Sequence, residues 1–160
     1  MRRRRGWDAQ PATRCDVLLA SDGRREFSSA AVARAAELAG RSGSVAAVVV
    51  AKIYGSSFGL PHPGLMPTRQ ELDERQRWLE TALAELRRRG VQADGQIAAT
   101  RRATKKLAAI AALREPRTVV IDESTATGLR RLIEGDVGAE LRKKLRSAGI
   151  EVEVVPALRA

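Results

Sequence analysis

The sequence predicts a three-layer α/β/α domain in which a mainly parallel, five-stranded sheet lies between two layers of helices. Short aliphatic runs alternate along the chain with segments that have the 3.6-residue period of an amphipathic helix, and this order is typical of parallel sheets. The 160 residues suit one domain, and a 44% hydrophobic but only 3% aromatic composition predicts a core of Val, Leu, Ile and Ala.

The first strand and helix are predicted from the aliphatic run at 15–20 and the segment that follows it. The run "CDVLLA" ends at the turn signal "SDG", as a fully buried strand would. A helix is expected from Ser28 to Gly40, where the glycine ends it. Residues 44–54, rich in β-branched valine, then predict the second buried strand.

The second helix has the clearest start signal in the chain. Residues 55–67 hold many glycines and prolines and predict a long loop. The next four residues, "TRQE", predict a capping box with Thr68 as N-cap and Glu71 at the third helical position. Leucines at helical spacing continue this pattern up to Gly90.

The second half of the chain repeats the alternation. Strands are expected at 91–100, 117–122 and 150–155, with a helix at 103–114 between the first two. A fourth helix is expected before the last strand. Four apolar residues define its buried face: Val137, Leu141, Leu145 and Ala148.

The carboxyl ends of the first and fourth strands are the expected ligand loops. Right-handed crossovers make the sheet mainly parallel, and ligands of such sheets bind where the strand order reverses. The first strand ends in "SDG" and the fourth in "IDESTATG".

The sequence lacks the motifs of several catalytic classes. Neither a P-loop, nor a G-x-G-x-x-G fingerprint, nor a G-x-S-x-G elbow is present. With one His and one Cys, the chain offers no His/Cys metal set and no intrachain disulfide. We therefore expect a non-enzymatic protein with no catalytic residue and no metal.

Positive charge is the strongest compositional feature. The formal net charge is +10, of which the first 14 residues, with five arginines and one aspartate, supply +4. These residues are expected to form a disordered basic arm. A second cluster comprises Arg101, Arg102, Lys105 and Lys106, and we expect it to lie far from the ligand loops if the third strand is at a sheet edge. Either cluster could attract nucleic acid, although the scarcity of aromatic residues disfavours that reading.

The chain resembles the universal stress protein family over residues 15–156. The segments "VLLASDGRREFSSAAVARAAELA" and "TGLRRLIEGDV" carry the likeness, and the loop "GSSFGLPHPGLMPTRQELDE" resembles actinobacterial members. The resemblance implies strand order 3-2-1-4-5, a stress-response role, and a homodimer formed through the C-terminal strand. It also implies that Asp22 faces the adenosine of a bound nucleotide. The single cysteine fits a reducing cytoplasm.

The phosphate loop of the family's ATP-binding members is poorly kept here. Their pattern G-x2-G-x9-G-[ST] falls on Asp122, Thr125, Gly135 and Asp136, so one of four positions matches. A carboxylate at ~4 Å from a phosphate charge costs ~1 kcal/mol in water and ~4 kcal/mol at an effective dielectric constant of 20. The expectation is a degenerate site without cofactor, in which Asp136 is the N-cap of the fourth helix.

Two alternatives remain open beside this expectation. In the first, the pocket still binds ATP or AMP, with Mg²⁺, through Asp22, Thr127, Gly128 and Gly135. In the second, the protein binds a polyanion through the arm and the 101–106 cluster. Residues 157–160 are expected to be a short tail.

Overall fold

Nine helices and strands, with one short 3₁₀ turn, alternate along the described chain. The computed structural model describes residues 14–53, 66–124 and 135–157. The expected arm up to residue 13, most of the 55–67 loop and residues 158–160 of the tail lie outside these ranges. The elements are β1 (Val17–Ser21), α1 (Ser29–Ala39), β2 (Ser44–Lys52), α2 (Arg69–Arg88), β3 (Gln92–Thr100), α3 (Ala103–Arg114), β4 (Thr118–Asp122), α5 (Val137–Leu145), η2 (Arg146–Ala148) and β5 (Glu151–Val155).

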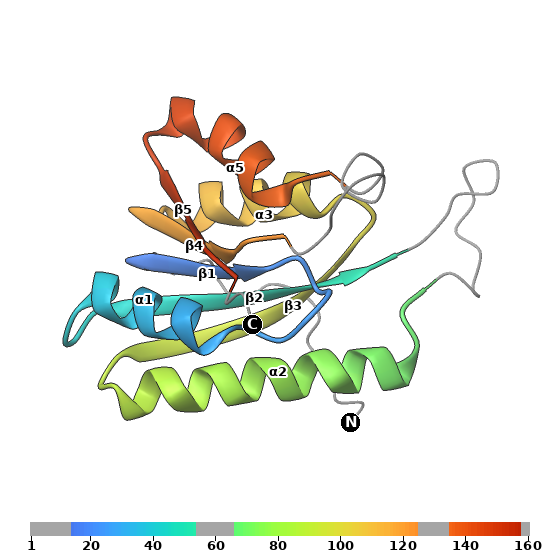
Figure 1. Cartoon of the computed structure of the whole chain (residues 1–160), viewed down its shortest axis with the longest axis horizontal. Coiled ribbons are helices and arrows are strands. Elements are labelled where there is room, and N and C mark those ends of the chain that lie inside the picture. The colour runs from blue at the N-terminus through green and yellow to red at the C-terminus, as the bar shows by residue number, and fades with distance from the viewer. Residues whose placement is uncertain (1–13, 54–65, 125–134, 158–160) are drawn as a thin grey trace, which may run out of the picture.

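The five strands form one parallel sheet in the order β3-β2-β1-β4-β5. Figure 1 shows α1 and α2 on one side of the sheet and α3 and α5 on the other. The predicted fold class and strand order are confirmed. The strand order reverses between β1 and β4, whose following helices lie on opposite faces, so the carboxyl ends of these strands border a crevice.

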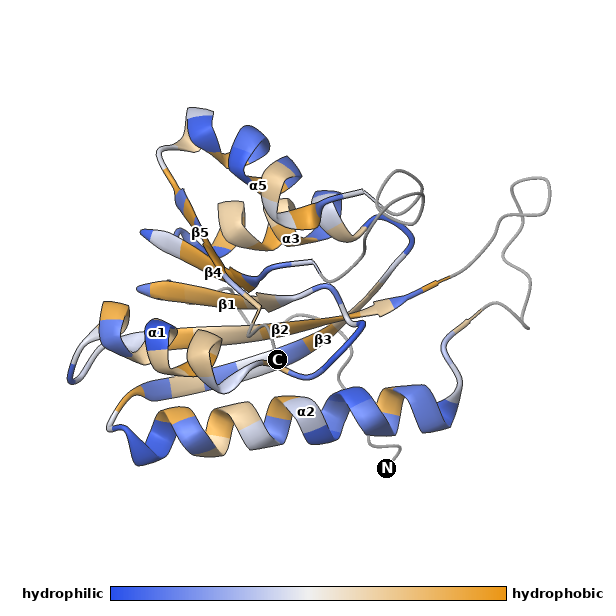
Figure 2. Ribbon diagram, viewed as in Figure 1, coloured by the Kyte–Doolittle hydropathy of each residue, from blue (hydrophilic) through white to orange (hydrophobic). Residues whose placement is uncertain are grey.

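Each face of the sheet has its own aliphatic core. Alternate residues of β1 point to opposite sides: Leu18 packs with Leu107 of α3 and Leu141 of α5, whereas Leu19 packs with the α1 and α2 side chains. The colouring in Figure 2 shows apolar residues concentrated on the inner strands. Because helices cover both faces of β1, β2 and β4, the residues of these strands form continuous apolar runs in the sequence.

The predicted helix ends are largely confirmed. The Ser28 hydroxyl caps α1, Gly40 follows its last turn, and Thr68 and Glu71 form the reciprocal capping box of α2. Two details differ. The second strand ends at Lys52 rather than at residue 54, and Ala148 is exposed in the 3₁₀ turn η2 because α5 already ends at Leu145.

Candidate functional site

A cavity of about 290 Å³ opens at the carboxyl edge of the sheet, on the side of α3 and α5. Its lining residues come from the ends of β1 and β2, the start of α3 and the length of α5. Its described lining residues are Asp22, Arg24, Lys52, Arg101, Arg102, Ala103, Thr104, Lys105, Val137, Glu140 and Lys144.

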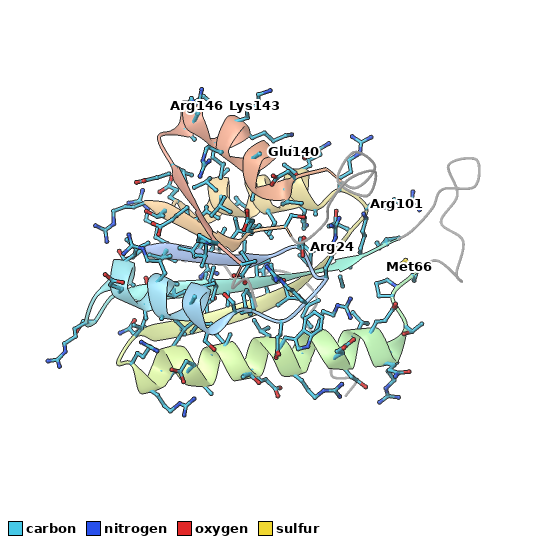
Figure 3. The ribbon with its side chains drawn as sticks, viewed as in Figure 1. Arg24, Met66, Arg101, Glu140, Lys143 and Arg146 are labelled. Atoms are coloured by element: carbon cyan, nitrogen blue, oxygen red, sulfur yellow. The ribbon has the colours of Figure 1, made fainter. Side chains whose placement is uncertain are left out.

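The lining is strongly cationic. Six of the described residues are lysine or arginine and two are acidic, which leaves a net charge of +4. Figure 3 shows Arg24 and Arg101 beside the carboxyl ends of the strands, with Glu140 above them on α5. A concave site with a large excess of one sign concentrates ligands of the opposite sign. We call this site the cationic cavity.

The turn after β1 places Asp22 in the cavity. The Ser21 hydroxyl accepts a hydrogen bond from Gly23 N (3.1 Å), and the Asp22 carboxylate accepts one from Arg24 N (3.1 Å). The Arg75 guanidinium of α2 donates to the carbonyl of Gly23 at 2.8 Å. Gly23 has φ +83°, and a Cβ on it would lie 1.9 Å from the carbonyl oxygen of Val50. The "SDG" signal therefore marks a turn that requires glycine and that orients Asp22.

The 101–106 cluster does not lie apart from this site, contrary to expectation. Although β3 is an edge strand, Arg101, Arg102 and Lys105 line the same cavity as Asp22. The reason is topological: α3 crosses back over the sheet from β3 toward β4, so its first turn overlooks the carboxyl ends of the inner strands. Lys106 faces a neighbouring apolar groove of about 520 Å³.

A hydrogen bond between two helices closes one side of the cationic cavity. The Thr104 hydroxyl of α3 donates to the Glu140 carboxylate of α5 at 2.6 Å. Glu140 lies in the first turn of α5, where the helix dipole favours an acid, and its other oxygen lies beside Gly135. This contact fixes the spacing between the first turns of α3 and α5.

Two of the candidate phosphate-loop residues stabilise the N-termini of α1 and α5. Asp122 accepts hydrogen bonds from the Ser28 hydroxyl and from Ser28 N, the latter at 3.0 Å, and so supports the N-cap of α1. Asp136 accepts a hydrogen bond from Ala139 N at 3.1 Å and is the N-cap of α5, as predicted. N-caps of this type stabilise a helix by about 1 kcal/mol. Both carboxylates therefore have structural roles at these positions.

The structure brings few of the sequence-predicted site residues together. Asp22 lines the cationic cavity; Asp122, Gly135 and Asp136 are not among its described lining residues. Asp22 and Asp122 also line a small pocket of about 10 Å³ between the ends of β1 and β4. Gly135, with φ +72°, contacts the cavity indirectly through Glu140. Thr125, Thr127 and Gly128 lie outside the described residues.

Sequence reasoning missed five of the polar and charged residues that line the cavity. These are Arg24, Lys52, Thr104, Glu140 and Lys144. The place of Lys52 at the carboxyl edge of the sheet was predictable, because a lysine at the end of an otherwise apolar strand indicates where the strand meets solvent. Thr104, Glu140 and Lys144 lie on helix surfaces, and only the packing of α3 against α5 shows which way they face.

Other site chemistries receive little support in the described ranges. No group of three or more metal-binding side chains occurs in residues 14–53, 66–124 and 135–157. Cys15 is buried, and burial raises the pKa of its thiol, which disfavours the reactive thiolate. No helix among the described residues is long and apolar enough to span a bilayer.

Solved universal stress proteins have this fold. One from Archaeoglobus fulgidus is 17% identical, with a TM-score of 0.61 over 89% of this chain and 93% of its own. The A. fulgidus protein in complex with dAMP is 16% identical, with a TM-score of 0.59 over 91% and 98%. A universal stress protein in complex with cAMP is 13% identical, with a TM-score of 0.62 over 91% and 100%.

These likenesses establish the fold alone, because the identities are low. No protein-family model matches the sequence, and no curated protein matches it. The chain thus has the five-stranded parallel fold of the universal stress proteins, with a cationic cavity at the carboxyl edge of its sheet.

Proposed function

We propose that this chain is a non-enzymatic, cytoplasmic regulatory protein of the universal stress protein family, of actinobacterial type, that binds an adenine mononucleotide such as AMP. The observation that carries the proposal is the net charge of +4 in a cavity at the carboxyl ends of β1 and β2. Two universal stress proteins of the same fold were solved with dAMP and cAMP bound, which is consistent with a mononucleotide ligand.

Lysine and arginine side chains, rather than a glycine-rich loop, would bind the phosphate. With Asp122 and Asp136 committed to N-caps, the loop pattern is degenerate, and Asp136 adds a negative charge near it. Each lysine or arginine at ~4 Å from a phosphate oxygen contributes ~1 kcal/mol in water and up to ~4 kcal/mol at an effective dielectric constant of 20. Arg101, Arg102 and Lys105 therefore suffice to offset the repulsion.

The size and polarity of the cavity favour a small nucleotide. Its volume of about 290 Å³ is at the lower end of the range for small-molecule sites, so AMP fits better than a dinucleotide. Asp22 would accept hydrogen bonds from the ribose hydroxyls or the adenine amino group. The other carboxylate in the cavity, Glu140, already accepts a hydrogen bond from Thr104. A cavity in which one of the two described carboxylates is engaged in this way suits ligand binding rather than catalysis.

The proposed regulatory unit is a homodimer formed through β5. This strand lies at the edge of the sheet, with Val152 buried and Glu151 exposed. Arg34 of α1 binds the Glu153 carboxylate at 2.5 Å and 3.2 Å, which covers one of the two strand glutamates. A pairing partner would satisfy the free edge of the strand.

Isothermal titration of AMP into the Asp22→Ala variant tests the proposed site. At moderate salt, we expect the wild-type protein to bind one AMP per chain with a Kd below ~100 µM. Asp22→Ala should weaken binding about tenfold, because ligand donors lose their acceptor.

The matched control is Asp73→Ala on α2, which makes the same change in charge on an exposed residue away from the cavity. It should bind AMP as the wild type does. Absence of measurable binding to the wild type, or equal affinity in wild type and Asp22→Ala, would refute the proposed site.

A further inference from the structure

Charge is divided unequally between the two helical layers. Helix α1 carries one cation and one anion, and α2 carries five of each, so this layer is neutral. Helices α3 and α5 together carry six cations and a single acid, but Arg114 is buried and paired with Asp94 of β3, which leaves a net charge of +4 on this layer. The positive charge of the folded domain is thus concentrated on one side of the sheet rather than spread evenly.

The exposed cations of the α3 and α5 layer have few acidic partners. Five of them have no ion pair or side-chain hydrogen bond within the described part of the chain: Lys105, Lys106, Lys143, Lys144 and Arg146. The α1 and α2 side also has exposed cations without an ion pair, but other arginines there do pair with nearby acids: Arg34 with Glu37 at 3.2 Å, and Arg89 with Glu85 at 3.0 Å. In Figure 3, Lys143 and Arg146 extend away from the sheet at the outer end of α5.

Helix stability does not explain all of these cations. Lys143 and Arg146 lie at the carboxyl end of α5, where the dipole favours positive charge. Lys105 and Lys106 lie in the first turn of α3, whose N-cap, Arg102, makes no side-chain capping hydrogen bond. Each cation there is unfavourable by about 0.3–1 kcal/mol. An anion bound at this turn would make these cations favourable instead.

The placement of the aromatic residues narrows the class of anion. Phe27 and Trp78 both belong to the core on the α1 and α2 side. The opposite face, in the described ranges, therefore offers cations without rings on which unpaired bases could stack. This combination suits the phosphate backbone of a duplex rather than single-stranded nucleic acid.

We propose that this face binds the backbone of double-stranded DNA without sequence preference. The duplex-binding face consists of Lys106, Lys143 and Arg146, with Lys105 and Lys144 at the rim of the cationic cavity. Helix α5, with nine residues, is about 14 Å long, and a duplex presents one charge per about 1.7 Å of its axis, so several phosphates come within reach of the face. The proposal is independent of nucleotide binding in the cavity.

Fluorescence anisotropy with a labelled duplex of about 20 base pairs tests the proposal, using the full chain over roughly 50–200 mM salt. The variant Lys106→Gln/Lys143→Gln/Arg146→Gln removes three charges from the face and leaves the residues that line the cavity intact. We expect it to weaken duplex binding at least about tenfold and to reduce the salt slope by about 3.

The matched control is Arg41→Gln/Arg69→Gln/Arg77→Gln, which removes three exposed charges from the end of α1 and from α2. Both variants keep the arginine-rich N-terminus, so its contribution cancels. The control should stay within about twofold of the wild type. Equal losses in the two variants would show a net-charge effect and overturn the proposal. So would binding to anionic phosphatidylserine vesicles by a wild type that does not bind the duplex.

Discussion

The double substitution Arg101→Glu/Lys105→Glu is expected to weaken AMP binding on the order of 100-fold, or about 2.8 kcal/mol. Both residues line the cationic cavity, and the change lowers the described lining charge from +4 to zero. Each substitution removes an attraction and adds a repulsion of ~1 kcal/mol or more at contact distance. Isothermal titration at moderate salt measures the loss.

The variant should remain folded, which keeps the result interpretable. Position 105 lies in the first turn of α3, where a glutamate is favoured by the helix dipole, and both positions are exposed. Arg69→Glu/Arg77→Glu on α2 makes the same change in net charge across the sheet and should bind AMP nearly as the wild type does. If this control loses as much affinity as the cavity variant, the long-range field of the protein, and not the cavity, binds the nucleotide.

Gly23→Ala is expected to lower the free energy of unfolding by about 3 kcal/mol, with a fall in Tm of roughly 10 °C. The new Cβ would lie 1.9 Å from the carbonyl oxygen of Val50, so backbone must move, and φ +83° is unfavourable for any L side chain. Urea and thermal unfolding followed by circular dichroism measure the effect. Because Gly23 lies between Asp22 and Arg24, AMP affinity should fall as well.

Gly149→Ala separates strain from steric conflict. Gly149 has φ +71° and ψ 18°, a left-handed conformation, but a Cβ there would meet no atom within 4 Å. The substitution should therefore cost about 1 kcal/mol, from backbone strain alone. Equal destabilisation by the two substitutions would mean that the close approach of Gly23 to β2 is unimportant for stability.

Local signals in the sequence were sufficient to predict the helices and strands, whereas the strand order came from the family resemblance. The Thr68 and Glu71 capping box, the Ser28 cap and the Gly40 stop depend on contacts within one turn of a helix, so the sequence contains them directly. Strands buried on both faces are equally predictable, because they form continuous apolar runs. Ala148 was wrongly assigned to the buried face because the 3₁₀ turn after Leu145 breaks the helical period.

The site was harder to predict because it depends on contacts far apart in the chain. Asp22 follows directly from the turn after β1, whereas Lys52, Arg101, Glu140 and Lys144 meet only through the crossing of α3 over the sheet. The sequence placed Arg101 and its neighbours at a remote edge, since strand order alone does not show where the next helix begins. The N-cap role of Asp136 was predictable, as it uses a backbone donor three residues away.

The most direct test of the central claim is a comparison of AMP with adenosine by isothermal titration into the wild-type protein at moderate salt. If the cationic cavity binds the ligand through its phosphate, adenosine should bind at least about 30-fold more weakly than AMP, a difference of about 2 kcal/mol. Equal affinities for AMP and adenosine would contradict the account, because the positive charge of the cavity would then contribute nothing to ligand binding.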